Sequence, residues 1–308
     1  GAGGKQLPPP PPPSQAQPET ATAAEEDGAV GPPPGFYGSP SKGYACVIGW
    51  GDGSQALSLA RDGDQYRIVV FEPDPAKAAE ARQRLADAGF FGRHAQVVAA
   101  RPEQVRLAPY WASLVVVGAI ERGAEAEARL SACLDLLRPY GGELRLAQGR
   151  IRADLAQRLL AARSGYSLAS AGEGLTVRRL APPEGADDWT HEAGGPENCF
   201  ANAERLVRWP LGVLWYSGDI DRFFTPALHF QHQRQPFPLV AGGRMFLITG
   251  VWLHAIDVYT GSYLWKAEMP LTPWVQTRFF DSRMYGRPTE RNCVAAADRA
   301  YVVTGEQI

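Results

Sequence analysis

Short apolar runs alternate with amphipathic stretches along residues 37–181. The apolar runs predict strands at residues 44–48, 67–71, 95–99, 113–118 and 142–147, and a final hairpin at 166–169 and 175–179. The stretches between them have helical periodicity and predict helices at residues 53–62, 75–88, 124–137 and 151–163. Regular alternation of this kind is typical of a parallel, doubly wound sheet. We therefore expect an α/β Rossmann-like domain over residues 37–181.

The hydrophobic pattern changes after this unit. Pro182, Pro183 and Gly185 break the alternation, so we interpret residues 182–188 as a linker. In residues 189–308 the helical periodicity disappears, and aromatic residues alternate with turn residues. This pattern predicts strands at 245–249, 253–258 and 263–267, with a turn at 259–261 between the last two. The second unit is therefore expected to be all-β.

The first 36 residues have a composition that differs from both units. They are rich in proline, alanine and glycine and contain almost no large apolar side chains. Such a segment buries too little surface to offset the entropy lost on ordering. We expect residues 1–36 to be disordered, with the prolines at 8–13 acting as an extended spacer.

Charge and cysteine content add little to this picture. The 31 basic and 33 acidic residues give a net charge of -2, so we expect no nucleic-acid partner. No apolar run reaches the roughly 20 residues that a membrane-spanning helix needs. Cys46 and Cys133 lie in apolar surroundings and are interpreted as buried free thiols. Whether Cys199 and Cys293 form a disulfide is left undecided by the sequence, and the cysteines do not indicate a compartment.

The stretch from Tyr44 to Glu72 contains the clearest candidate chemistry. It reads YACVIGWGDGSQALSLARDGDQYRIVVFE: an apolar strand, a loop with Gly49, Gly51 and Gly53, a helix, and a second strand that ends at an acidic residue. Glycines let a backbone approach a ligand closely, and the first turn of the helix has free N–H groups. A carboxylate after the second strand can accept hydrogen bonds from ribose hydroxyls. This order predicts a nucleoside-cofactor site.

VIGWGDG, followed by VVFEPDPAKAAEARQRLADAGFFGRHAQVVAA, resembles the first two motifs of class I S-adenosylmethionine-dependent methyltransferases. The resemblance covers about 140 residues, which is the size of a typical domain. It implies that Gly49, Gly51 and Gly53 wrap the methionine and ribose end of S-adenosylmethionine, and that Glu72 binds the ribose hydroxyls. An NAD(H)-binding Rossmann domain is the competing interpretation, because Gly49-x-Gly51-x-x-Ser54 nearly fits its fingerprint.

The chain departs from the methyltransferase pattern at three places. Val47 stands where the family usually has an acidic residue, two positions before the first glycine. Residues 99–101 contain no acidic residue for the adenine, and residues 118–120 contain no acceptor motif. Glu121 is the nearest carboxylate and is interpreted as a solvated residue. The pattern therefore favours cofactor binding over turnover, and we assign no catalytic residue.

The second unit resembles a repeat of the PQQ-binding-like β-propeller, the fold of quinoprotein dehydrogenases. The residues that match its signature are Ala255, Asp257, Gly261, Leu264 and Trp265. Gly212, Leu214 and Trp215 match its end about 50 residues earlier, which is a propeller-blade length with loop insertions. The opening strand VAGGRMFLI also recurs as VAAADRAYVV near residue 300.

This resemblance implies an incomplete propeller over residues 189–308, because a propeller needs at least about four blades. We expect the chain to be a piece of a longer protein. The matched residues are structural, so we expect no bound pyrroloquinoline quinone, and the surface is expected to present a substrate or a protein partner. His229 and His232 are assigned to a loop between strands and not to a metal site.

Together these patterns predict an S-adenosylmethionine-binding, methyltransferase-like domain fused to a quinoprotein-like propeller. The alternative is a non-catalytic binding scaffold of the cell envelope with a degenerate Rossmann domain. The propeller suggests the periplasm and the first domain the cytoplasm, so the compartment stays open.

Overall fold

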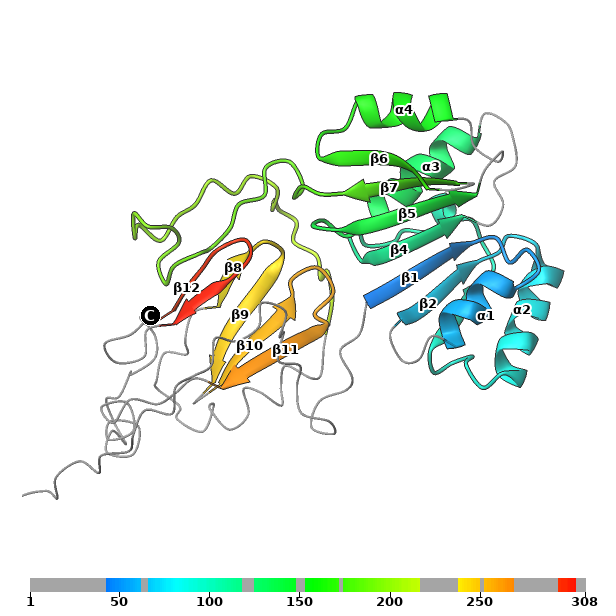
Figure 1. The fold of residues 1–308 in the computed structure, drawn as a ribbon, viewed down its shortest axis with the longest axis horizontal. Coiled ribbons are helices and arrows are strands. Elements are labelled where there is room, and N and C mark those ends of the chain that lie inside the picture. The colour runs from blue at the N-terminus through cyan, green and yellow to red at the C-terminus, as the bar shows by residue number, and fades with distance from the viewer. Residues whose placement is uncertain are drawn as a thin grey trace, which may run out of the picture. The chain divides into compact units, whose positions relative to one another are not determined.

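The computed structural model describes residues 43–61, 66–117, 125–147, 153–171, 174–216, 238–249, 252–268 and 293–302. The first part of the chain forms a seven-stranded sheet of order β3-β2-β1-β4-β5-β7-β6 (Figure 1). Its strands are β1 (Gly43–Ile48), β2 (Tyr66–Phe71), β3 (Ala95–Val98), β4 (Ala112–Val117), β5 (Gly142–Ala147), β6 (Tyr166–Ala171) and β7 (Gly174–Arg179). Its helices are α1 (Ser54–Arg61), α2 (Pro75–Asp87), α3 (Glu125–Leu136) and α4 (Ala153–Ala161). These elements begin and end within one or two residues of the predicted ranges.

The sheet is mostly parallel, as in a Rossmann-like fold. Strands β1 to β5 pair in parallel, whereas β7 lies between β5 and β6 and is antiparallel to both. The structure therefore has the expected parallel pairing for five strands and the predicted hairpin at this edge. Its two strands are antiparallel because a short turn between them reverses the chain.

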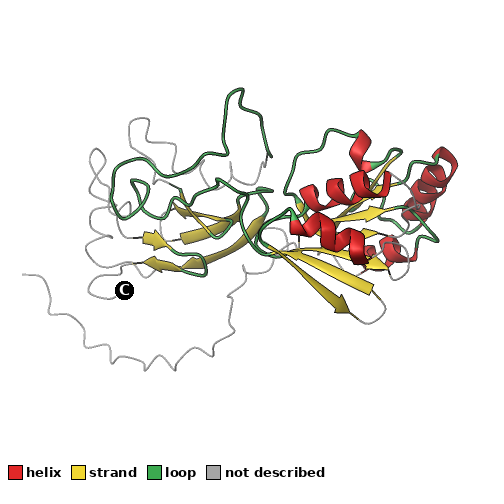
Figure 2. Ribbon diagram, turned by 90° about the horizontal axis from the view of Figure 1, so that it is seen from above, coloured by secondary structure: helices red, strands yellow, loops and turns green. Residues whose placement is uncertain are grey.

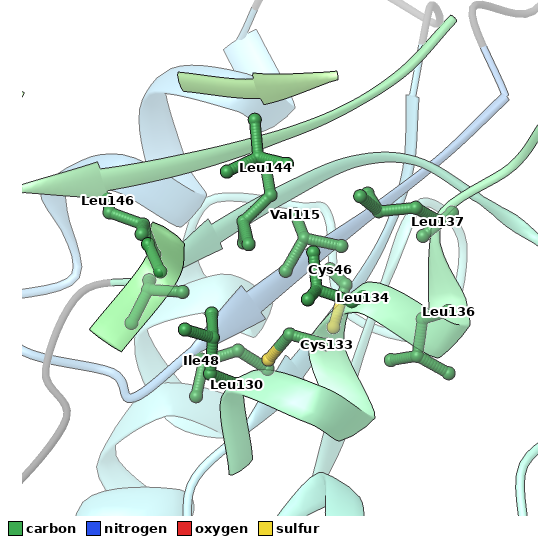
Figure 3. Packing of buried hydrophobic residues seen from close by; sticks show 14 of the residues in the cluster. Cys46, Ile48, Val115, Leu130, Cys133, Leu134, Leu136, Leu137, Leu144 and Leu146 are labelled. Carbon is green, nitrogen blue, oxygen red and sulfur yellow. The ribbon is translucent and has the colours of Figure 1, made fainter. Parts of the chain in front are cut away.

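The helices cover both faces of the sheet. Buried residues of α1 and α2 pack with Ala45, Val47 and Val70 on one face. Buried residues of α3 pack with Cys46, Ile48 and Val115 on the other, where side chains of α4 join them. Figure 3 shows this second cluster, with the side chains of α3 meeting those of β1, β4 and β5. Successive residues of each strand thus serve opposite cores, as the two-residue period requires.

Helix α2 begins where the sequence indicates. The Asp74 side chain accepts hydrogen bonds from the backbone N–H groups of Ala76 and Lys77, and Pro75 occupies the first helical position. A carboxylate at the N-cap satisfies N–H groups that have no partner within the helix. Beyond the helix, Gly89 has a φ of 77°. The chain therefore leaves the helix through a glycine, which tolerates the left-handed region.

The four cysteines differ sharply in accessibility. Cys46, Cys133 and Cys293 are buried, Cys199 is exposed, and all four are free thiols. The disulfide between Cys199 and Cys293, which the sequence left undecided, is therefore not formed. Burial raises the pKa of Cys133 to about 12 and that of Cys293 to about 11, and it raises the pKa of Cys46 well above its ordinary value.

These differences predict selective labelling by a thiol reagent. Only thiolates react at an appreciable rate, so native protein at pH about 8 should be alkylated at Cys199 alone. Denatured protein should be alkylated at all four cysteines. Mass spectrometry of labelled peptides measures both results, and rapid labelling of Cys46 in native protein would contradict the buried position.

The second part of the chain consists of antiparallel strands and loops, with no helix among the described residues after 188 (Figure 2). Strands β8 (Leu239–Ala241), β9 (Arg244–Thr249), β10 (Trp252–Asp257) and β11 (Tyr263–Glu268) form a four-stranded sheet in which each strand pairs with the next. Strands β12 (Cys293–Ala295) and β13 (Ala300–Val302) form a separate hairpin. The described residues contain these antiparallel sheets and no closed propeller.

The predicted turn at 259–261 has the expected chemistry. The Asp257 side chain accepts hydrogen bonds from the N–H groups of Tyr259 and Thr260, and Gly261 has a φ of 66°. The indole of Trp215 donates to the carbonyl of Val258 at 2.7 Å and lies against Gly261, where a Cβ would come within 2.3 Å of the ring. The tryptophan that ends the earlier repeat-like segment thus packs on the turn of the next one.

His254 lies in β10, an inner strand of the four-stranded sheet, and is 1% exposed. Burial and, secondarily, the charge of Lys266 lower the pKa of His254 to about 4. The imidazole therefore stays neutral in the folded protein at neutral pH.

This burial predicts that acid destabilises the sheet β8–β11. The pKa of His254 is lower in the folded than in the unfolded chain, so its stabilising effect is complete above pH about 6.5 and is lost as pH falls toward 4, by up to about 1.4 kcal/mol per pH unit. Protection factors of the β9–β11 amides, which correct for the pH dependence of intrinsic exchange, should fall over this range. A His254→Gln variant should show a flatter pH dependence, and an unchanged one would contradict the assignment.

Candidate functional site

The glycine loop connects β1 to α1 at the carboxyl end of the sheet. Gly49, Gly51 and Gly53 have φ values of 82°, 60° and 78°. Side chains with a Cβ rarely adopt this region, so the loop conformation requires glycine at these positions. The Gly49 N–H donates to the carbonyl of Phe71 at 2.8 Å, which ties the start of the loop to the end of β2.

Glu72 fastens the loop from the neighbouring strand. Its side chain is 6% exposed; one carboxylate oxygen accepts from the N–H of Trp50 at 2.8 Å, and the other accepts from the N–H of Asp74 at 3.0 Å. A carboxylate offers about four acceptor positions, so these two bonds leave capacity for two more. Glu72 can therefore hold the loop and still accept hydroxyl groups of a ligand.

Trp50 is a residue of the site that the sequence reasoning missed. Its side chain is 2% exposed, and its indole N–H donates to Glu80 of α2 at 3.4 Å. The guanidinium of Arg84 lies 5.3 Å from the centre of the ring and also donates to the carbonyl of Asp52 at 2.8 Å. A large aromatic side chain between two loop glycines was the available signal, and it indicates that the loop is packed on α2.

The two later glycines have different surroundings. A Cβ on Gly53 would lie 2.4 Å from the Trp50 ring, whereas a Cβ on Gly51 would meet nothing within 4 Å. Gly53 is therefore needed for packing inside the protein. Gly51 leaves space on the outer side of the loop, as the close approach of a ligand requires.

The residues present fit the ribose and methionine end of a nucleoside cofactor better than its base. Glu72 has acceptor capacity and Gly51 has free space, while Val47 is buried in the core at 1% exposure. Arg101 pairs with Glu125 and precedes a 3₁₀ turn (Pro102–Gln104), and residues 99–101 contain no carboxylate. Residues 118–120 and Glu121 lie outside the described residues.

A groove lies beside the glycine loop. Its volume is about 800 Å³, and it extends from the first turn of α1 across β4, β5 and β7. The charged side chains that line it are Glu143, Arg145 and Arg178. Gly49 and Glu72 do not line it. It is therefore a space adjacent to the loop, with its own chemistry.

The described residues offer no metal centre and no membrane helix. No three His, Cys, Asp or Glu residues gather in the described ranges in a way that could hold a metal ion. His229 and His232 lie outside those ranges. None of the described helices is long and apolar enough to cross a bilayer.

No family model and no curated protein matches the chain, but solved structures resemble about half of it. A putative S-adenosyl-L-methionine-dependent methyltransferase from Methanococcus maripaludis has 14% identity and a TM-score of 0.36, covering 46% of this chain and 78% of that one. A protein from Corynebacterium glutamicum has 25% identity and a TM-score of 0.38, covering 49% and 77%. Magnesium protoporphyrin IX methyltransferase from Synechocystis PCC 6803, solved with bound SAM, has 19% identity and a TM-score of 0.37, covering 46% and 71%. Likenesses of this size say nothing about the chemistry of this chain.

Proposed function

We propose that the α/β part of the chain binds S-adenosylmethionine and belongs to a methyltransferase-like protein. Gly49, Gly51 and Gly53 would surround the methionine and ribose end, and Glu72 would accept the ribose hydroxyls. The observation that carries the proposal is the glycine loop held open at the carboxyl end of the sheet by a buried carboxylate that keeps acceptor capacity.

The sheet order favours this proposal over NAD(H) binding. Dinucleotide-binding sheets have the order 3-2-1-4-5-6. Here the antiparallel β7 lies between β5 and β6, and Ser54 stands in place of the third glycine of the dinucleotide fingerprint. Bound S-adenosylmethionine would supply an electrophilic methyl group on a sulfonium. The contribution of this chain would be to bind and orient the cofactor, because methyl transfer depends mainly on the alignment of the two reactants.

We further propose that the β segment is part of a quinoprotein-like propeller that presents a substrate or a protein partner. Four consecutive antiparallel strands, β8 to β11, are the number that one propeller blade contains. The contact of Trp215 with the turn at Gly261 supports repeats that pack through their tryptophans. The hairpin β12–β13 has the sequence pattern of β8–β9, as a following repeat would.

Calorimetric titration tests the cofactor proposal. Wild-type protein should bind S-adenosylmethionine and should bind NAD(H) far more weakly. Gly51→Ala should weaken binding of S-adenosylmethionine at least about tenfold, because the added Cβ fills the space that the ligand approaches. Gly89→Ala, at a glycine after α2 that also has a positive φ and space for a Cβ, provides a matched control outside the loop. Absence of binding at millimolar S-adenosylmethionine would overturn the proposal.

A second candidate function is a non-catalytic binding scaffold. The buried Val47 and the absence of a carboxylate at residues 99–101 favour it, because both remove groups that the methyltransferase resemblance implies. A scaffold would bind neither S-adenosylmethionine nor NAD(H) in the same titration. The two candidates therefore give opposite results in one experiment.

A further inference from the structure

The groove beside α1 has a floor of charged side chains. Glu143 and Arg145 of β5 project to the face that α1 covers, while Leu144 and Leu146 of the same strand are buried on the opposite face. Arg178 of β7 lies directly opposite Glu143 in the antiparallel register. The volume of the groove, about 800 Å³, falls within the range of small-molecule sites.

The charges on this floor do not cancel. Arg145 Nε donates to one oxygen of Glu143 at 2.5 Å, and Arg178 Nε donates to the other oxygen at 2.9 Å. Two guanidinium groups therefore share a single carboxylate, which leaves an excess of positive charge. Their side chains are 59% and 60% exposed, while that of Glu143 is only 16% exposed.

Both guanidinium groups keep free hydrogen-bond donors. Each contacts Glu143 through Nε alone, so the terminal nitrogens of the two forks have no acceptor within the described residues. Paired forks of this kind match the geometry of carboxylate and phosphate oxygens. Because Glu143 contacts both arginines, it also holds the two forks close to each other.

The first turn of α1 adds a backbone N–H donor beside the carboxylate of Asp52, which caps this helix end. Ser54 and Gln55, in the first turn of the eight-residue helix α1, line the groove. The Ser54 N–H is occupied by Asp52, whereas the Gln55 N–H has no acceptor within the described part of the chain. The N-terminus of a helix attracts negative charge. The Gln55 N–H and the two arginines thus offer donors to the same kind of ligand.

We propose that this groove binds the anionic group, a carboxylate or a phosphate, of a small molecule through Arg145 and Arg178. Glu143 pairs with both guanidinium groups and is the negative charge with which an incoming anion competes. If the chain is a methyltransferase, the groove lies where an acceptor could reach the cofactor loop, and the acceptor is then an anionic molecule. Only this last assignment rests on the proposed function.

Arginine-directed modification tests the site in the whole chain without S-adenosylmethionine. The protein is treated with phenylglyoxal in the presence of inorganic phosphate, succinate or sodium chloride of equal ionic strength, and modified peptides are quantified by mass spectrometry. Phosphate or succinate should slow the modification of Arg145 and Arg178 about tenfold relative to chloride, as expected for bidentate binding. The comparison of phosphate with succinate shows which oxyanion the groove prefers.

Arg299 is a matched control. It is also paired with a neighbouring carboxylate, Asp298, and its side chain is 63% exposed. Arg299 should be modified at the same rate in all three salts. Equal protection of Arg299, or no protection of Arg145 and Arg178, would overturn the proposal. Because the assay contains no cofactor, its result is independent of whether S-adenosylmethionine binds.

Two variants separate an anion site from simple surface ion pairs. Arg178→Gln should raise the anion concentration that half-protects Arg145 about tenfold, since one fork is lost. Glu143→Gln should lower that concentration severalfold, because it removes the competing negative charge. If the three side chains form only a surface ion pair, anions should not protect the arginines in any of the variants. The proposal would be contradicted if anions protected Arg145 less well in a Glu143→Gln variant that has the thermal stability of the wild type.

Discussion

Replacing Gly53 with alanine is expected to destabilise the α/β part by about 3 kcal/mol. Two effects add at this position. Gly53 has a φ of 78°, which costs an L-residue about 1–2 kcal/mol. A Cβ would also lie 2.4 Å from the buried Trp50 ring, which is held by Glu80 and Arg84 and cannot move without losing those contacts. Urea denaturation followed by circular dichroism measures the loss.

Gly51→Ala is the matched control for this prediction. Gly51 also has a positive φ, but a Cβ there meets nothing within 4 Å. Only the backbone term remains, so the expected loss is about 1 kcal/mol. Equal losses in the two variants would contradict the packing of Trp50 under the loop. The pair also separates roles, because Gly51→Ala is the variant expected to lose cofactor binding while remaining folded.

The local parts of the site could be predicted from the sequence. Gly49, Gly51 and Gly53 lie within five residues of one another, and a strand before them and a helix after them indicate where the loop lies. Glu72 follows the next strand, and parallel strands bring their carboxyl ends to the same edge of a sheet. The ranges of strands and helices follow from their periods for the same reason.

Contacts between distant strands could not be predicted. The pairing of Glu143 with Arg178 depends on β7 lying between β5 and β6, and a hairpin at the end of a sheet can join it by either strand. Trp50 was missed because the pattern around a glycine loop does not say on which helix an aromatic side chain packs.

Glu72 has a structural role that changes how its proposed function must be tested. Its carboxylate accepts the N–H groups of Trp50 and Asp74, so Glu72→Ala would leave the buried Trp50 N–H without an acceptor. That loss costs about 1–3 kcal/mol before any ligand is considered. Weak binding of S-adenosylmethionine by this variant alone would therefore not identify a contact with ribose.

A thermodynamic cycle separates the two roles of Glu72. Wild-type protein should bind S-adenosylmethionine about tenfold more tightly than its 2′-deoxy analogue, because a hydrogen bond from a hydroxyl to a carboxylate is lost. In Glu72→Gln both ligands should bind more weakly, and the difference between them should largely disappear. Glu127→Gln, an exposed position on α3, should leave both affinities unchanged.

The outcome of this cycle depends on the unused acceptor positions of one buried carboxylate. If Glu72 serves only to fasten the loop, Glu72→Gln should weaken both ligands by the same factor, and the preference for the ribose hydroxyl should persist. If the carboxylate also receives the ribose, the preference should vanish with the charge. Calorimetric titration of both ligands against wild type, Glu72→Gln and Glu127→Gln distinguishes these results, because the cycle cancels the cost of loosening the loop.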